Sequence, residues 1–110
     1  MARTKRSAKL DTRSARLKLA AEERHQEPLS PGRYLVYRRP KSGAAGSWAA
    51  YWVNPETKKK TLDRLGVADD YEDADGSRVL TFAQAQAKAA DRFKELERHA
   101  LLADSPTPQD

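Results

Sequence analysis

Aromatic and branched apolar residues gather in three short runs along the chain, and each run is followed by proline, Asn-Pro or glycine. The runs cover residues 33–39, 47–53 and 59–65. Segments of this length and composition, bounded by turn residues, are typical of β-strands. Because the connections between them are short, the pattern predicts a three-stranded antiparallel sheet.

The spacing of apolar residues changes to steps of three and four after residue 80. Thr81 and Gln84 have the spacing of a capping box, in which the two side chains satisfy backbone N–H groups at a helix start. We therefore expect a helix from Phe82 to about Ala100, with an apolar stripe that covers one face of the sheet. The expected fold class is α+β, a three-stranded antiparallel β-sheet packed against one C-terminal α-helix. The stripe consists of Phe82, Ala85 or Ala89, Phe93, Leu96 and Ala100.

The two ends of the chain lack this patterning. Residues 1–32 are expected to form a basic, partly helical or flexible N-terminal arm and linker, in which Asp11 caps a marginal helix over roughly residues 12–24. Two prolines and a glycine near the end of this arm indicate turns, so we place the folded domain at residues 33–103. Residues 104–110 are expected to be a disordered tail or linker.

Strand alternation assigns the expected sheet residues to two faces. The residues expected to face the helix are Leu35, Tyr37, Trp48, Ala50, Trp52, Thr61, Asp63 and Leu65. The residues expected on the opposite, outer face are Val36, Arg38, Ala49, Tyr51, Val53, Lys60, Leu62 and Arg64. The second set joins long cations to a tyrosine, and such a face suits the major groove of DNA, which admits a small sheet or ribbon.

Charge is distributed unevenly and strengthens that picture. The chain has a formal net charge of +5. Residues 1–24 hold eight basic and three acidic residues, and residues 33–66 hold eight basic and two acidic ones. From Asp69 onward there are five basic and ten acidic residues. This polarity predicts one surface that attracts a polyanion and another that faces away from it.

We therefore expect a partner of double-stranded DNA, with arginines selecting bases and lysines holding phosphates. The candidate contacts in the sheet region are Arg38, Arg39, Lys41, Tyr51, Lys58, Lys59, Lys60 and Arg64. The candidate contacts in the arm are Arg13 and Arg16, together with Arg3, Lys5 and Arg6.

Three other interpretations of the same residues remain open. The cations can be the ordinary solvated side chains of a half-exposed sheet. The chain can be a protein-interaction module in which Trp48, Trp52 and the amphipathic helix contact another subunit. A basic sheet with aromatic residues can also stack unpaired RNA bases, although the aromatic residues here are needed for the core.

Other classes of function find little support in the composition. The chain contains no cysteine, which excludes disulfides and cysteine-based metal or nucleophile sites. No apolar run approaches the roughly 20 residues of a membrane helix. We expect a soluble, intracellular protein with no membrane or small-molecule partner.

We also expect no metal ion or cofactor. The acidic stretch from Asp69 to Asp75 matches only part of an EF-hand loop, because Tyr71 and Phe82 stand where the first and the closing ligands belong. We expect a surface loop there that keeps DNA on the opposite side of the molecule. His25 and His99 lack neighbours at ligand or catalytic spacing, and we expect both to be exposed.

An ordered series of short motifs carries a family resemblance. It comprises Arg38-Arg39, Gly46-Ser47-Trp48, the segment from Leu65-Gly66 through Ala68-Asp69-Asp70-Tyr71 to Gly76, and Val79-Leu80-Thr81-Phe82-Ala83-Gln84-Ala85-Gln86. The series resembles the N-terminal arm-type DNA-binding domain of phage and prophage tyrosine recombinases, the integrases. Leu10–Leu17 is similar to the basic segment that leads into that domain.

The resemblance implies a non-catalytic module of a site-specific recombination system. In that family a three-stranded sheet with a helix binds arm-type DNA sites through the sheet, and catalysis belongs to a larger C-terminal domain. The resemblance also implies a cytoplasmic, nucleoid-associated location in a bacterial host, and other recombinase subunits as further partners. We expect no strand cleavage by this chain, and the tyrosines Tyr34, Tyr37, Tyr51 and Tyr71 to be packing or surface residues.

Overall fold

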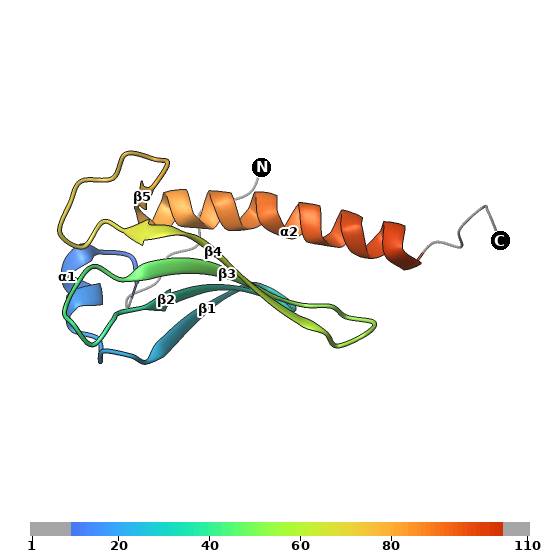
Figure 1. The fold of residues 1–110 in the computed structure, drawn as a ribbon, viewed down its shortest axis with the longest axis horizontal. Coiled ribbons are helices and arrows are strands. Elements are labelled where there is room, and N and C mark those ends of the chain that lie inside the picture. Colours follow the sequence, from blue (N-terminus) through green and yellow to red (C-terminus); the bar gives the residue numbers. More distant parts are fainter. Residues whose placement is uncertain (1–9, 105–110) are drawn as a thin grey trace.

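A curved sheet of five strands with a long helix across one face makes up the computed structural model, which describes residues 10–104 (Figure 1). In chain order the elements are α1 (Arg13–Leu17), β1 (Arg24–Ser30), β2 (Arg33–Arg38), β3 (Ser47–Val53), β4 (Lys60–Ala68), β5 (Val79–Leu80) and α2 (Phe82–Asp104). The arm cations Arg3, Lys5 and Arg6 and residues 105–110 of the expected tail lie outside the described residues.

The α+β class is confirmed, but the expectation of a three-stranded sheet is wrong. The sheet has the order β1-β2-β3-β4-β5. Strands β2, β3 and β4 correspond to the three predicted runs and are antiparallel. Strand β1 adds an antiparallel edge beside β2, and the two-residue β5 adds a parallel edge beside β4. The result is a mixed sheet that curls into half a barrel (Figure 1).

Strand β1 lies in the segment expected to be an arm and linker. Its residues alternate between exposed and partly buried positions, but only Leu29 among them is a typical apolar core residue. Pro28 was interpreted as part of a turn. Proline is nevertheless tolerated in an edge strand, because one side of that strand makes no ladder hydrogen bonds. Charged residues are also common on edge strands. The segment therefore has the composition of a protected sheet edge.

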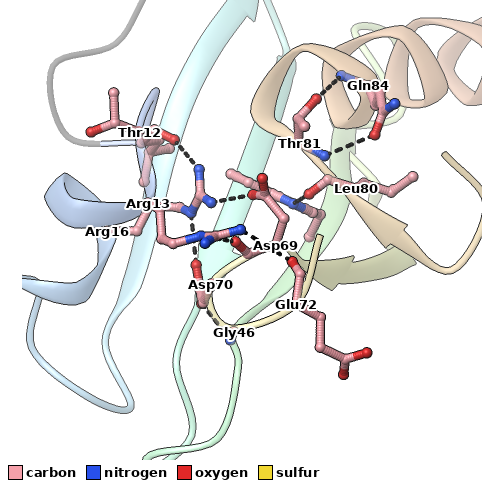
Figure 2. A network of polar contacts seen from close by, with 12 residues as sticks. Thr12, Arg13, Arg16, Gly46, Asp69, Asp70, Glu72, Leu80, Thr81 and Gln84 are labelled. Carbon is pink, nitrogen blue, oxygen red and sulfur yellow. Dashed lines mark hydrogen bonds and ion pairs between the residues drawn. The ribbon is translucent and has the colours of Figure 1, made fainter. Parts of the chain in front are cut away.

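Helix α2 covers the inner face of the sheet through its apolar stripe. Phe82, Ala85, Ala89 and Phe93 are buried against the sheet, and Trp48 donates a hydrogen bond of 2.9 Å from Nε1 to the Leu80 carbonyl. The helix starts at the predicted capping box. Gln84 N donates to Thr81 Oγ1 at 3.1 Å, and Thr81 N donates to Gln84 Oε1 at 3.0 Å (Figure 2). It runs four residues beyond the expected end at Ala100.

Two ion pairs tie α2 to the inner face farther along the helix. Arg92 Nε contacts Asp63 Oδ2 of β4 at 2.7 Å, and Glu97 accepts from Arg33 of β2. Both partners in each pair are partly exposed, so each pair contributes less than about 1 kcal/mol to stability. Their effect is to fix the direction in which the helix crosses the strands.

The buried carboxylate of Asp70 joins the N-terminal segment to the sheet (Figure 2). Arg16, whose side chain is 1% exposed, donates from Nε to Asp70 Oδ1 at 2.8 Å and forms a second ion pair with Asp69. Asp70 Oδ2 accepts from the Tyr37 hydroxyl at 2.6 Å and from Gly46 N at 2.8 Å. Every oxygen of this carboxylate therefore has a partner.

Glycine is required at position 46 in this cluster. A Cβ there would lie 2.5 Å from Cε1 of Tyr37, and no side-chain carbon can approach a buried ring so closely. Because Gly46 N also binds Asp70, the backbone has to pass directly over the tyrosine.

Helix α1 is shorter than expected and has a different cap. Thr12 Oγ1, rather than Asp11, accepts from Ala15 N at 3.2 Å. The helix ends at Leu17 instead of continuing toward residue 24. Arg39 donates to the Leu17 and Leu19 carbonyls, and Glu22 takes a left-handed φ of 66°. These contacts turn the chain so that β1 can begin.

Replacing Arg16 with alanine should destabilise the protein by about 3–5 kcal/mol, since it leaves Asp70 buried without its cation. Urea unfolding of wild type and R16A measures the difference. The matched control is R98A, which removes an exposed arginine of α2 and should change stability by less than about 0.5 kcal/mol. A loss below about 1 kcal/mol in R16A would contradict a stabilising role for the cluster.

Burial and, second, the hydrogen bond to Asp70 raise the pKa of Tyr37 well above its ordinary value. The stability from the neutral hydroxyl is therefore complete below the unfolded-state pKa of about 10 and is lost as the pH rises above it. Between pH 10 and 11.5, wild type should lose up to about 1.4 kcal/mol per pH unit more than Y37F does. Urea unfolding across that range tests this, and parallel curves for the two proteins would count against it.

Candidate nucleic-acid interface

The face of the sheet turned away from α2, called the outer face below, is defined by the strand register. Arg24 of β1 is opposite Arg38 of β2, and Arg38 is opposite Ser47 of β3. Residues opposite one another share a face. The outer face comprises Arg24, Gln26, Pro28, Tyr34, Val36, Arg38, Ser47, Ala49, Tyr51, Val53, Lys60, Leu62 and Arg64.

The face assignments made from alternation hold for all three predicted strands. Trp48, Ala50 and Trp52 are buried toward α2, and Lys60, Leu62 and Arg64 are exposed on the outer face. Val36 is the exception, because it lies on the outer face as expected but is only 4% exposed.

Arg24 and Tyr51 explain why Val36 is covered. The guanidinium carbon of Arg24 lies 4.4 Å from the centre of the Tyr51 ring, a distance typical of a cation–π contact. The register places Val36 between these two residues. The Tyr51 ring also lies 5.6 Å from the Tyr34 ring. An arginine and two tyrosines therefore lie over the middle of the outer face.

The exposed cations of the outer face have no acidic partner among the described residues. None of the ion pairs within residues 10–104 includes Arg24, Arg38, Lys60 or Arg64. Arginines elsewhere are different: Arg13, Arg16, Arg33 and Arg92 each contact at least one carboxylate.

Like charges on neighbouring strands add to this imbalance. Arg24 and Arg38 are directly opposite in the antiparallel register. Two cations in such positions repel one another, which weakens strand pairing. The arrangement therefore stores an unfavourable interaction that a bound polyanion would relieve.

A shallow depression of about 450 Å³ lies at one end of the outer face. Arg38, Lys41 and Arg64 contribute cations to it, and Glu22 contributes a carboxylate. Pro40, Ala45 and Ser47 complete its lining.

Three predicted lysines lie at the opposite end of β3 and β4. Lys58 and Lys59 belong to the exposed turn between the strands, and Lys60 begins β4. The turn is held by Asn54 Oδ1, which accepts from Glu56 N at 2.9 Å and from Thr57 N at 3.3 Å. Lys58 has a left-handed φ of 64°.

Three of the predicted contacts already have hydrogen-bond partners within the protein. Arg16 is buried in the Asp70 cluster, so it does not reach the surface. Arg39 donates to the backbone carbonyls of Leu17 and Leu19 at 2.8 and 2.6 Å. Arg13 donates from Nε to the Asp69 carbonyl at 2.6 Å and forms an ion pair with Asp73. Their charge therefore serves the fold, because their partners are supplied by distant segments.

Arg24 and Tyr34 belong to the outer face but were not among the predicted contacts. Tyr34 follows from the same alternation that assigned Arg38, since both are at even positions of one strand. Arg24 would have been found by the alternation of residues 24–30, if that segment had been treated as a strand.

The acidic stretch differs in part from the expected surface loop. Asp70 is 1% exposed and belongs to the buried cluster. Asp75 Oδ1 accepts from the backbone N–H groups of Val79, Ser77 and Arg78, and these bonds lower the pKa of that carboxyl. Within the described residues, no three histidine or acidic side chains are grouped closely enough to hold a metal ion.

The two histidines lie apart from the outer-face cations. His99 is exposed on α2, and His25 is partly buried on the inner face of β1, with its ring 6.5 Å from that of Tyr37. None of the helices over residues 10–104 has the length and apolar character needed to cross a membrane.

Comparisons of the chain with protein-family models, curated proteins and solved structures found no match. Its function therefore has to be inferred from the outer face itself.

Proposed function

We propose that this protein binds double-stranded DNA through the outer face of its sheet, as a non-catalytic module of a site-specific recombination system. The observation that carries the proposal is the separation of charge. The outer-face arginines have no acidic partner among the described residues, whereas the two arginines of α1 and two arginines between the sheet and α2 each form an ion pair with a carboxylate. A polyanion is the partner that such a face attracts.

Three of the five strands together have a width comparable with that of the major groove. Adjacent strands lie about 4.8 Å apart, so β2, β3 and β4 span about 10 Å between their axes. The major groove of B-DNA is about 12 Å wide, and it admits a two-stranded ribbon or a helix. The helix side and the acidic 69–78 segment would then face away from the duplex (Figure 1).

Different outer-face residues have different roles in this proposal. Arg38 and Arg64 are exposed at the end of the outer face that holds the depression, where they can contact backbone phosphates beside the groove. Leu62 is 54% exposed beside Tyr51, and an apolar side chain there suits the methyl group of thymine. Arg24 is held against Tyr51, so its position is fixed before a ligand arrives.

Recombination is supported by the motif series that resembles the arm-type domain of integrases. The Gly46-Ser47-Trp48 motif enters β3 at the Asp70 cluster, and the Thr81 motif caps α2. In this setting the partners are an arm-type DNA site and other recombinase subunits, and strand cleavage belongs to another domain.

Burial and the Arg24 contact weigh against two of the competing interpretations. Trp48 and Trp52 are 0% and 7% exposed, so they are not available to another subunit. Stacking of unpaired RNA bases has Tyr34 and Tyr51 on the surface in its favour. Arg24 already covers one face of the Tyr51 ring, which leaves less of it for a base.

Affinity for duplex DNA should fall steeply with salt. If the outer face neutralises four phosphates, the slope of log K against log salt concentration is about −3.6. Fluorescence anisotropy with a labelled duplex at several salt concentrations measures it, with single-stranded RNA of equal length as competitor. A flat response, or stronger competition by the RNA, would overturn duplex binding as the function.

Alanine at Arg38 or Arg64 should weaken duplex binding by about 1.5–3 kcal/mol each, because each variant loses charged hydrogen bonds to a backbone phosphate. The matched control, R98A, removes an exposed arginine from the helix side and should change affinity far less. Anisotropy titrations of the three variants give the comparison, together with urea unfolding to show that each is folded. Equal losses in all three variants would mean that only net charge matters.

A further inference from the structure

The depression on the outer face combines three free cations with one carboxylate. Arg38 and Arg64 lie on β2 and β4, while Lys41 follows Pro40 in the loop toward β3. Within the described part of the chain, none of these cations forms an ion pair. The volume of the depression, about 450 Å³, is within the range of sites that hold small ligands.

The cations are arranged so that one anion can contact more than one of them. Arg38 is paired with Ser47, which also lines the depression. Arg64 is paired with Ala49, two residues farther along β3. Guanidinium groups bind phosphate oxygens through two parallel hydrogen bonds, and lysine adds a point charge. A phosphate group is the ligand that this donor set fits.

Glu22 introduces a negative charge into the same depression. It is held there by the backbone, since it has a left-handed φ of 66° and its N–H donates to the Arg39 carbonyl at 2.7 Å. Left-handed backbone is unfavourable for a residue with a side chain, so this placement costs free energy. The carboxylate forms no ion pair with Arg38, Lys41 or Arg64.

A carboxylate beside an anion site penalises each additional negative charge on the ligand. A phosphodiester carries one charge, whereas a phosphate monoester carries about −1.5 to −2 at pH 7. Glu22 therefore disfavours free phosphate and mononucleotides more than it disfavours the DNA backbone.

We propose that this depression binds one phosphodiester of a nucleic-acid backbone, and that Glu22 reduces the advantage that the three cations would otherwise give to phosphate monoesters. The identification of the diester with DNA rests on the proposed function, but binding of the isolated group does not. Arg38 and Arg64 contact the phosphate oxygens, Lys41 adds charge, and Glu22 reduces the advantage of monoesters.

The test follows backbone amide chemical shifts during titrations of the whole chain with three probes: a dinucleoside monophosphate, a mononucleoside 5′-phosphate and inorganic phosphate. We expect the dinucleoside monophosphate to shift the amides of Lys41, Ala45 and Ser47. R38Q and R64Q should each weaken it at least fivefold, and the control R98Q should leave its affinity unchanged. E22Q should strengthen binding of the two other probes at least threefold more than that of the diester.

Two results would overturn the proposal. One is a diester probe that shifts no amide at the depression, or that binds R38Q and R64Q as well as wild type. The other is an E22Q variant with the same preference among the probes as wild type, which would remove the selective role of Glu22.

A duplex titration separates this proposal from the proposed function. If R38Q and R64Q bind the duplex as well as wild type, and the diester probe shifts no amide at the depression, the protein still binds DNA but this site is rejected. Diester binding at the depression without salt-dependent duplex binding would retain the site and reject DNA binding.

Discussion

Asp70 holds together four segments that are far apart in the sequence. Its carboxylate contacts Arg16 of α1, Tyr37 of β2 and Gly46 before β3, and it lies itself just after β4. Removing a charge from water is costly, and the cost is met here because both oxygens have donors. A helix of five residues is not stable alone, so α1 depends on tertiary contacts such as this one.

The cluster also explains how one face of a basic protein can retain free cations. Arg13 and Arg16 form ion pairs with carboxylates of the 69–73 segment. Arg33 and Arg92 form ion pairs with carboxylates between the sheet and α2. The carboxylates of these ion pairs therefore lie on the helix side and at the end of the sheet. The outer face is left with arginines whose charge has no partner in the described structure.

Sequence patterning predicted the central strands and α2 because their apolar residues are strongly periodic. It missed β1, whose residues alternate in burial but are mostly polar, and it treated Arg16 and Arg39 as surface cations. A count of charges contains no information about partners, and the carboxylates that pair with Arg16 are more than fifty residues away. The Arg24 contact with Tyr51 depends on β1 and was missed with it.

The edge position of β1 determines where an autonomous folding unit can begin. A fragment starting at Arg33 would contain every strongly apolar strand, yet it would lack Leu10, which is 1% exposed in the core, and the cation of Arg16. It would also present β2 as a new, unprotected edge with Val36 uncovered, and such an edge is a template for pairing with another chain. The polar segment before residue 33 thus covers the edge of β2 and prevents that strand from pairing with another molecule.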